Sequence, residues 1–394
     1  MNDTLFTNLQ SFRASLNTVF LEREEIIDGL LASVITKQNA FLFGVPGTGK
    51  SELVKAVSNG FNGSKFFGYL LSPTTDPSEL FGPVAVSRLL KDEYHRDVEG
   101  YLPSCNIAFL DELFRGSSAV LNSLLTILNE RVFNNGKLVV ETPIQSIVAA
   151  TNSFPQEEAL QAFCDRFLFR PTVDLLKNPV SKRKLDQWTL NIQKRPSVES
   201  SLTYECLVQL QKAVEEVEPS EDFLDSFSQV LDLLSARGIT ISDRRRVQVL
   251  KFMRGWALVK GDDRIYPEHL YGSFTHMVYR TPDDLVVIDE VLKQAVPTVD
   301  KLTSDIKRAM SGLMTKYHSM HSREAKSIED ISRFVAELKK LHTDLSKLSN
   351  ALTKIMEDGQ YRMTITQRSD ATKLSQQIDS NLQTIAKSIN EIAS

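Results

Sequence analysis

The sequence predicts an α/β protein whose parallel sheet carries helices on both faces, followed by an all-α domain and a C-terminal helical hairpin. Three observations support this fold class. Short apolar runs alternate with helical patterns over residues 1–178, as buried parallel strands and their crossover helices do. Helical periods alone recur over 179–285, which predicts the all-α domain. Long, polar helical patterns then fill 286–394.

Composition narrows the class of protein. A chain of 394 residues is too long for one ordinary core, so two or three domains are expected. Its apolar fraction of 42% is usual for a soluble protein, and it holds no run of about 18 apolar residues that could span a membrane. A net charge of −4, without a long run of one sign, argues against a dedicated nucleic-acid-binding protein.

The start of the chain and its cysteines predict a cytoplasmic location. The first residues, MNDTLFTNLQ, lack the basic start and apolar run of a signal peptide. The three cysteines are odd in number and lack the spacing of a metal site: Cys105, Cys164 and Cys206. We therefore expect reduced thiols that act as small core residues.

The elements of the first part follow in a regular order. Helical patterns over 5–36 precede the first strand pattern, 40–43, and a second strand pattern covers 66–71. Turn residues at both ends of 80–103 indicate an excursion out of the core rather than a plain crossover. The run 107–110 is fully apolar, which is typical of a buried parallel strand.

A helix, a hairpin and a further strand complete this part. An apolar face repeats at helical spacing over 118–130. Asn134, Asn135 and Gly136 lie between two β-rich runs, which predicts a β-hairpin over 132–142. Residues 144–150 form the last buried strand pattern.

The C-terminal region contains two long apolar repeats. Apolar residues recur at three and four over 328–355 and again over 374–392, and Gly359 and Tyr361 mark a turn between them. Two such helices joined by a short turn predict an antiparallel, coiled-coil-like hairpin. The alternative is that both helices pack on the preceding domains instead.

A glycine-rich segment separates the first strand pattern from the helix that follows it. It reads Gly44-Val45-Pro46-Gly47-Thr48-Gly49-Lys50-Ser51. Backbone N–H groups of such a loop cradle phosphate oxygens, and the helix start adds its positive dipole end. Lys50 would reach the β- and γ-phosphates of a nucleotide, and the Ser51 hydroxyl would hold Mg²⁺. A plain glycine-rich turn is the alternative interpretation.

Polar side chains follow two of the predicted strands. Asp111 and Glu112 end the strand at 107–110, in the crevice where α/β sheets bind ligands. Asp111 would orient Mg²⁺, and Glu112 would polarise the water that attacks the γ-phosphate. Asn152 follows the strand at 144–150 and could hold that water or a phosphate oxygen, although an Asx turn or a helix cap would also explain it.

Two arginines are candidates for contacts with the γ-phosphate. Arg166, in Asp165-Arg166-Phe167, could reach a neighbouring subunit's nucleotide as an arginine finger, or could form a surface ion pair. Arg244 lies in the first turn of a predicted helix, where the macrodipole disfavours a cation. This position indicates another task, such as reaching back to the γ-phosphate, against the alternative of a solvated charge cluster.

In this order, the segments resemble an AAA+ ATPase of the MoxR group, and within it the RavA-type proteins. The resemblance covers about residues 10–285. The runs that carry it are Glu79-Leu80-Phe81-Gly82-Pro83, Gly100-Tyr101-Leu102-Pro103, Phe109-Leu110-Asp111-Glu112, Leu121-Asn122-Ser123-Leu124-Leu125-Thr126-Ile127-Leu128-Asn129-Glu130-Arg131, Val148-Ala149-Ala150-Thr151-Asn152, Asp165-Arg166-Phe167 and Ile241-Ser242-Asp243-Arg244-Arg245.

The resemblance implies a role for each candidate residue. Asn152 becomes sensor 1, Arg166 the arginine finger, and Arg244 sensor 2, with Arg245 as the alternative because the register of the triple arginine is open. The Walker A and B motifs would bind ATP and Mg²⁺ through Gly44, Pro46, Gly47, Thr48, Gly49, Lys50, Ser51, Glu52, Asp111 and Glu112.

The resemblance also implies an architecture and partners. It implies a five-stranded P-loop core over 1–178, a lid over 179–285 and a helical extension over 286–394. The excursion would be the insert in helix 2, which together with the hairpin faces the pore or upper surface of a ring. Similar proteins form hexamers, often with a von Willebrand factor A domain partner. RavA-type proteins carry a strand-containing insertion near the C-terminus, whereas 286–394 has no clear strand pattern.

The leading interpretation is a ring-forming ATPase that remodels protein complexes. A nucleic-acid motor is the second, because related helicases share the insert and the hairpin. The balanced charges of the insert, and the single Lys137 of the hairpin, do not favour a phosphate track. A scaffold switched by bound nucleotide is the third, and the complete set of hydrolytic residues argues against it.

Overall fold

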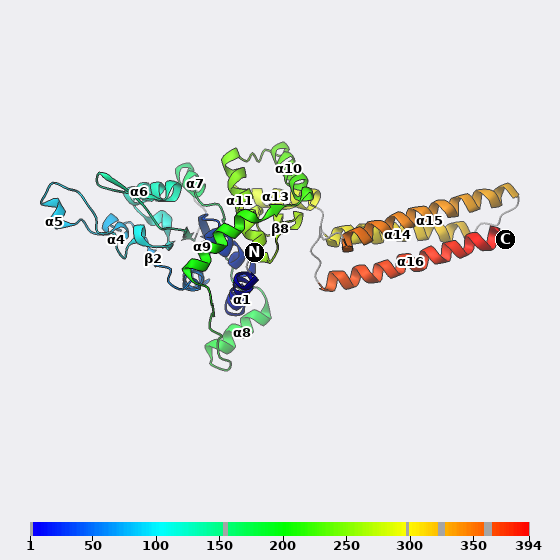
Figure 1. The fold of residues 1–394 in the computed structure, drawn as a ribbon, viewed down its shortest axis with the longest axis horizontal. Coiled ribbons are helices and arrows are strands. Elements are labelled where there is room, and N and C mark those ends of the chain that lie inside the picture. The colour runs from blue at the N-terminus through cyan, green and yellow to red at the C-terminus, as the bar shows by residue number, and fades with distance from the viewer. Residues whose placement is uncertain (1–2, 153–156, 297–298, 322–327, 358–364, 394) are drawn as a thin grey trace. The chain divides into compact units, whose positions relative to one another are not determined.

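A computed structural model describes residues 3–152, 157–296, 299–321, 328–357 and 365–393 (Figure 1). The chain divides into two compact units. The first comprises residues 1–265 with 269–292, and the second comprises 266–268 with 293–394. The sheet and the predicted site residues all belong to the first unit.

The sheet of the first unit has four hydrogen-bonded strands in the order β1-β6-β3-β2, all parallel. Every side chain of β1 and β6 is buried, because helices cover both faces of the sheet (Figure 1). The apolar runs of the sequence therefore predicted these strands. Their bounds are β1 Ala40–Phe43, β2 Phe66–Leu70, β3 Ile107–Asp111 and β6 Ser146–Thr151.

The fifth strand position is a short edge segment beside β1. Residues 169 and 172 form parallel bridges to Ala40 and Phe43. The Phe41 N–H donates to the Phe169 carbonyl at 2.8 Å, and the Val173 N–H donates to the Phe43 carbonyl at 2.6 Å. Pro171 lies between them and has no N–H to donate, which limits the ladder to isolated bridges.

Helices surround the sheet of the first unit. Helix α3 contacts β2 and β3, and α2 contacts α3. Helix α6 begins at the residue that the apolar pattern predicts, with the Ser117 side chain as its cap. The helices up to residue 164 are α1 Asp3–Val19, α2 Glu24–Ile35, α3 Lys50–Asn59, α4 Pro77–Phe81, α5 Val86–Leu89, α6 Ser118–Glu130 and α7 Glu158–Cys164.

The predicted excursion and the predicted hairpin lie side by side. The hairpin pairs β4 Val132–Asn135 with β5 Leu138–Glu141. The excursion closes on itself where the Ala85 N–H donates to the His95 carbonyl at 2.8 Å. The Asn135 side chain accepts from the Arg96 N–H at 2.6 Å and donates to the Arg96 carbonyl at 3.0 Å. One buried amide therefore fastens the excursion to the hairpin.

The second part of the first unit is helical, as predicted, with one addition. A two-residue parallel pair joins β7 Glu218–Pro219 to β8 Arg264–Ile265. Strands this short leave no periodic pattern, so the sequence predicted helices alone. The helices of this part, which we call the lid, are α8 Pro179–Thr189, α9 Tyr204–Ala213, α10 Glu221–Ala236, α11 Asp243–Lys260 and α12 Thr275–Val278, and α13 Asp284–Ala295 begins in it and ends in the second unit.

Helix α11 of the lid is anchored to the N-terminal helices by a buried carboxylate. Asp28 of α2 is fully buried and accepts from Arg13 of α1 at 2.9 Å. The Lys260 ammonium at the end of α11 lies 2.7 Å from the same carboxylate oxygen, Asp28 Oδ2. Two cations thus neutralise the buried carboxylate, as burial of a charge requires.

The second unit packs three helices around one apolar core. Leu338 and Leu345 of one helix, and Ile378 and Ile385 of another, are fully buried two turns apart. The predicted pairing of 328–355 with 374–392 is confirmed, and a third helix joins it through a 2.8 Å hydrogen bond between the hydroxyls of Tyr317 and Ser388 (Figure 1). The helices are α14 Val299–His321, α15 Ile328–Glu357 and α16 Ile365–Ala393.

The hairpin prediction did not include α14, because methionine and tyrosine replace the regular Leu and Ile of the other two helices at several core positions. Among the described helices, none combines the length and the apolar character needed to cross a bilayer.

Candidate active site

The glycine-rich loop lies between β1 and α3, at the carboxyl edge of the sheet. Gly47 and Gly49 have φ of +80° and +79°, which is the left-handed region that favours glycine. A Cβ on Gly44 would lie 2.3 Å from the Val173 carbonyl oxygen, so a larger residue does not fit there. Gly49 is the N-cap of α3, and the N–H groups in the first turn of α3 have no acceptor within the helix, so they can donate toward the loop. The loop therefore has the backbone of an anion-binding turn.

Lys50 is held inside this loop. Its side chain is 7% exposed, and its ammonium donates to the carbonyls of Gly44 at 2.7 Å and Val45 at 3.0 Å. Burial lowers the pKa of Lys50, and the carboxylates of Asp111 and Glu112 partly offset that effect. The Lys50 ammonium therefore interacts electrostatically with the carboxylates of Asp111 and Glu112.

Glu112 and Asn152 meet at the ends of neighbouring strands. Glu112 follows β3 with φ of +52°, in the left-handed region that few non-glycine residues adopt. Its N–H donates to the Asp111 side chain at 3.0 Å, and its own carboxylate accepts from the Asn152 amide. The Arg115 Nε lies 3.6 Å from the other carboxylate oxygen. The backbone and the amide together fix the direction of the Glu112 carboxylate.

Ser51 and Asp111 line one cavity of about 480 Å³ beside the loop. A hydroxyl and a carboxylate are ligands that suit Mg²⁺, which keeps several waters and takes few protein ligands. Among the described residues, no group of three His, Cys, Asp or Glu side chains could hold a metal ion by itself. Ser51 and Asp111 would fit Mg²⁺ as two of its ligands. We call residues 44–51 with Asp111, Glu112 and Asn152 the glycine-loop site.

A second cavity, of about 650 Å³, is lined by Gly47, Thr48 and Gly49 of the loop. Phe20 and Trp188 contribute rings to its lining, and the Arg195 guanidinium lies 5.9 Å from both ring centres. Arg195 also pairs with Glu52 of α3 at 3.0 Å. The sequence does not predict this wall, because its residues come from separate segments and carry no shared motif.

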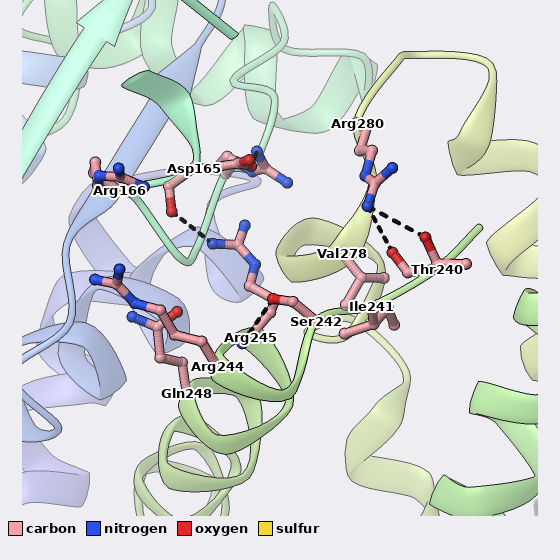
Figure 2. A pocket seen from close by; sticks show the side chains of 11 residues that line it. Asp165, Arg166, Thr240, Ile241, Ser242, Arg244, Arg245, Gln248, Val278 and Arg280 are labelled. Carbon is pink, nitrogen blue, oxygen red and sulfur yellow. Dashed lines mark hydrogen bonds and ion pairs between the residues drawn. The ribbon is translucent and has the colours of Figure 1, made fainter. Parts of the chain in front are cut away.

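Arg166 and Arg244 lie together and apart from the glycine-loop site. Both line a cavity of about 130 Å³, and no residue of 44–51 lines it. The sensor 2 role of Arg244 stays a prediction. Figure 2 shows the side chains around this space, which we call the arginine cavity. Its arginines are Arg166, Arg170, Arg244, Arg245 and Arg280.

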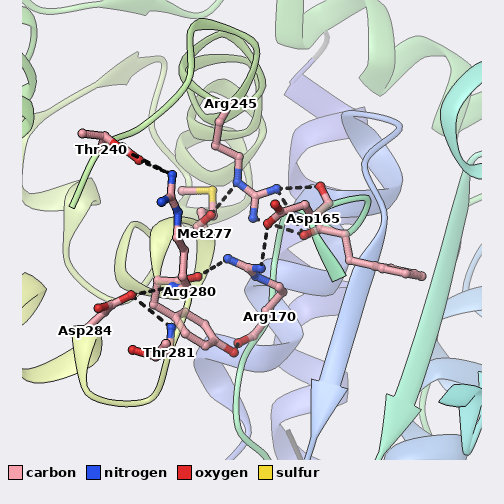
Figure 3. A network of polar contacts seen from close by, with 10 residues as sticks. Asp165, Arg170, Thr240, Arg245, Met277, Arg280, Thr281 and Asp284 are labelled. Atoms are coloured by element: carbon pink, nitrogen blue, oxygen red, sulfur yellow. Dashed lines mark hydrogen bonds and ion pairs between the residues drawn. The ribbon is translucent and has the colours of Figure 1, made fainter. Parts of the chain in front are cut away.

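Arg244 and Arg245 differ in what they contact. The Arg245 guanidinium donates to the carbonyls of Met277 at 2.7 Å, Asp165 at 3.1 Å and Phe167 at 3.3 Å (Figure 3). Burial lowers the pKa of Arg245 to about 9, so it keeps its charge at neutral pH. Arg244 is exposed, and its side chain therefore has the freedom to take a ligand that Arg245 lacks.

The chain matches the model of a known protein family. The model of the MoxR domain from MoxR–vWA–β-propeller ternary systems matches residues 7–212. The chain belongs to the MoxR family of AAA+ ATPases. An uncharacterised protein of Methanocaldococcus jannaschii is 33% identical over 287 residues, which cover 72% of this chain and 75% of that relative. The chaperone MoxR1 of Mycobacterium tuberculosis is 22% identical over 305 residues, covering 73% and 75%.

A solved structure confirms the fold of this MoxR chain. A protein of Cytophaga hutchinsonii that was assigned as an ATPase superposes with a TM-score of 0.61 at 17% identity. The match covers 75% of this chain and 96% of that protein. The α/β core predicted from the strand and helix patterns is therefore confirmed, whereas the RavA-type subgroup stays a prediction.

The insert and the hairpin of this MoxR chain expose apolar side chains. Leu90 of the insert is 83% exposed, and Val139 of the hairpin is 69% exposed. Val86, Leu89 and Leu138 are also more than half exposed. The Arg96–Asn135 hydrogen bonds join the two elements that carry these side chains. Exposed apolar residues gathered in this way are typical of a contact surface for another protein.

Proposed function

We propose that this MoxR protein assembles as a hexameric ring, hydrolyses ATP between subunits, and uses the hydrolysis to remodel protein complexes. The observation that carries the proposal is the separation, within one chain, of the glycine-loop site from the arginine cavity. Each holds part of the chemistry that hydrolysis of a nucleoside triphosphate needs. A ring supplies the missing part, because every interface then brings one subunit's loop against its neighbour's arginines.

The residues of the glycine-loop site would divide the work on one face of the interface. The loop N–H groups and Lys50 would bind the β- and γ-phosphates, and Ser51 and Asp111 would hold Mg²⁺. When bound, Mg²⁺ would neutralise charge on the phosphate oxygens. Glu112 would orient and polarise the attacking water, and Asn152 would keep the Glu112 carboxylate in place.

The neighbour would supply Arg166 and Arg244. The Arg166 Nε is buried and has no hydrogen-bond partner within the described part of the chain, which leaves a charged donor for an incoming anion. Arg244 lines the same cavity and is exposed. Two guanidinium groups from one subunit would thus stabilise the charge that develops on the other subunit's nucleotide.

The surface of the insert and hairpin favours a protein client over a nucleic acid. It exposes large apolar side chains such as Leu90 and Val139, and its exposed charged residues carry both signs, whereas a nucleic-acid track needs a row of cations for the phosphates. The matched family model comes from systems with a von Willebrand factor A component, which supports a partner of that class. The free cysteines, two of them buried, support the proposed cytoplasmic location.

The proposal is tested by measuring ATP turnover and mass in solution on the same preparation. We expect a hexamer in the presence of ATP and magnesium, and turnover that DNA or RNA does not stimulate. A monomer with full turnover would contradict the shared site. Stimulation by nucleic acid that falls with rising salt would favour the motor, and ATP binding without turnover would favour the nucleotide-switched scaffold.

A further inference from the structure

A residue of the lid, Arg245, forms hydrogen bonds with the backbone on both sides of Arg166. Arg245, in the first turn of α11, donates from Nη1 to the Asp165 carbonyl at 3.1 Å. Both Nη1 and Nη2 donate to the Phe167 carbonyl at 3.3 Å. The Nε donates to the Met277 carbonyl at 2.7 Å, within the lid itself (Figure 3). One guanidinium therefore joins the two neighbours of Arg166 to two segments of the lid.

The chemistry of this contact explains why an arginine occupies position 245. The carbonyls that follow α7 have no partners within that helix, and a cation at a helix C-terminus is favourable. The rigid fork of a guanidinium can bind several carbonyls at once, whereas a lysine ammonium is a single point of contact. Ser242 caps α11 by accepting from the Arg245 N–H at 3.2 Å, which fixes the starting point of the side chain.

A second lid contact braces the same segment. The Arg170 side chain is 2% exposed and lies over the Tyr279 ring at 4.8 Å. It donates to the Tyr279 carbonyl, and the Tyr279 hydroxyl donates to the Arg170 carbonyl at 2.8 Å. Arg170 also reaches the Asp165 carboxylate at 3.4 Å. The turn that presents Arg166 is thus fastened to the lid at both of its ends.

We propose that Arg245 is a positioning residue, which fixes the turn 165–167 so that Arg166 points at the neighbouring subunit's nucleotide. Through this contact a movement of the lid would move Arg166 and change turnover at the adjacent interface. The inference deepens the proposed function and rests on its assumption that Arg166 acts on a neighbour. Arg245 itself would act without touching the nucleotide, because its Nε, Nη1 and Nη2 each donate to a backbone carbonyl.

The first test compares Arg245→Ala with Arg246→Ala in the full chain. Arg246 is the next residue on α11, is exposed, and does not line the arginine cavity. We expect Arg245→Ala to lower kcat about 10-fold or more, with KM for ATP within about twofold, because misplacing a reacting group costs rate rather than binding. Arg246→Ala should retain the parent kcat. A raised KM with unchanged kcat would overturn the proposal.

The second test mixes chains with impaired turnover and separates this inference from the proposed function. Arg245→Ala chains retain an intact loop, and Glu112→Gln chains retain a positioned Arg166, so mixed oligomers should regain turnover. The parallel mixture of Arg166→Ala with Glu112→Gln is the reference. Recovery in the reference alone would overturn the role of Arg245 and leave the proposed function standing. Recovery in neither would overturn both.

Unfolding of the variant must be distinguished from loss of position. The thermal midpoint is therefore measured for each chain, and Arg245→Lys serves as the second variant. Lysine keeps the charge and the methylene packing but not the fork. We expect Arg245→Lys to retain the parent midpoint within a few degrees and to show a kcat between those of the parent and Arg245→Ala. Full kcat in a stable Arg245→Lys chain would overturn the proposal.

Discussion

The glycine-loop site and the arginine cavity belong to the same unit but are built in different ways. The first takes most of its residues from one continuous segment, 44–51, and the rest from the ends of two adjacent strands. The second collects residues from around 165–170, 240–248 and 278–280, and the lid and the core contribute jointly. The first depends on local backbone geometry, and the second depends on how the lid packs against the core.

This difference indicates a division of labour. The glycine-loop site would bind nucleotide whether or not the lid moves, because its geometry is set by β1, β3 and β6. The arginine cavity changes whenever the lid shifts, because Arg245 and Arg170 bridge the two domains. We therefore expect variants of the first to affect binding or chemistry, and variants of the second to affect turnover alone.

The largest effect is expected in the glycine-loop site. Glu112→Gln should bind ATP normally and lose turnover up to about 10⁴-fold, since the amide cannot act as a general base. Binding is measured by calorimetry and turnover by phosphate release, with the exposed Glu215→Gln as the control. Full hydrolysis by Glu112→Gln would remove this residue from its proposed role.

The arginine cavity should give the next largest effect. Arg166→Ala should lower turnover about 1,000-fold and leave ATP affinity unchanged, as expected of an arginine finger. Lys50→Ala should differ by losing affinity as well. Calorimetry on both variants tests the contrast, with Arg183→Ala of α8 as the control. A weakened affinity in Arg166→Ala would mean that this residue serves its own chain's nucleotide.

Lowering the pH should destabilise the region of the arginine cavity before it affects the glycine-loop site. The His276 ring lies against Phe169, and burial lowers its pKa to about 4. The unfolded chain takes up a proton below about pH 6.5 and the folded chain does not, so stability falls as the pH drops from about 6.5 to about 4. The loss should be at most about 2 kcal/mol at pH 5.

Urea unfolding of the parent chain and of His276→Phe, each at pH 7 and pH 5, measures the contribution of His276 to the loss of unfolding free energy. The phenylalanine keeps the ring contact and removes the titration, so the variant should lose less stability at pH 5 than the parent. Equal losses in both proteins would show that His276 does not titrate in this way.

The smallest effect concerns the apolar wall beside the loop. Trp188→Ala should raise KM for ATP about 10-fold and leave kcat nearly unchanged, because an aromatic ring lost from a ligand pocket removes uniform binding. Leu190→Ala, which is exposed and outside that cavity, is the control. Steady-state kinetics on both variants measure the two KM values. An unchanged KM for Trp188→Ala would mean that the base of the nucleotide does not bind against this ring.

The sequence predicts which residues come together in the glycine-loop site because that information is local, and their roles stay predictions. Glycines at fixed offsets, and acidic or amide residues after buried strands, identify positions without knowledge of the packing. The choice between Arg244 and Arg245 could not be made in this way, because both lie in the first turn of one helix. Only the packing of α11 against Asp165 and Phe167 distinguishes them. The Trp188 wall and the third helix of the second unit likewise depend on contacts between distant segments.

The central claim is that one subunit's glycine-loop site works with the neighbour's arginine cavity. The most direct measurement is turnover in mixtures of Arg166→Ala with Glu112→Gln, each inactive alone. Random mixing at equal amounts should restore about one interface in four, since each interface needs one chain of each kind in a fixed order. Turnover that never exceeds the sum of the two separate chains would contradict the shared site.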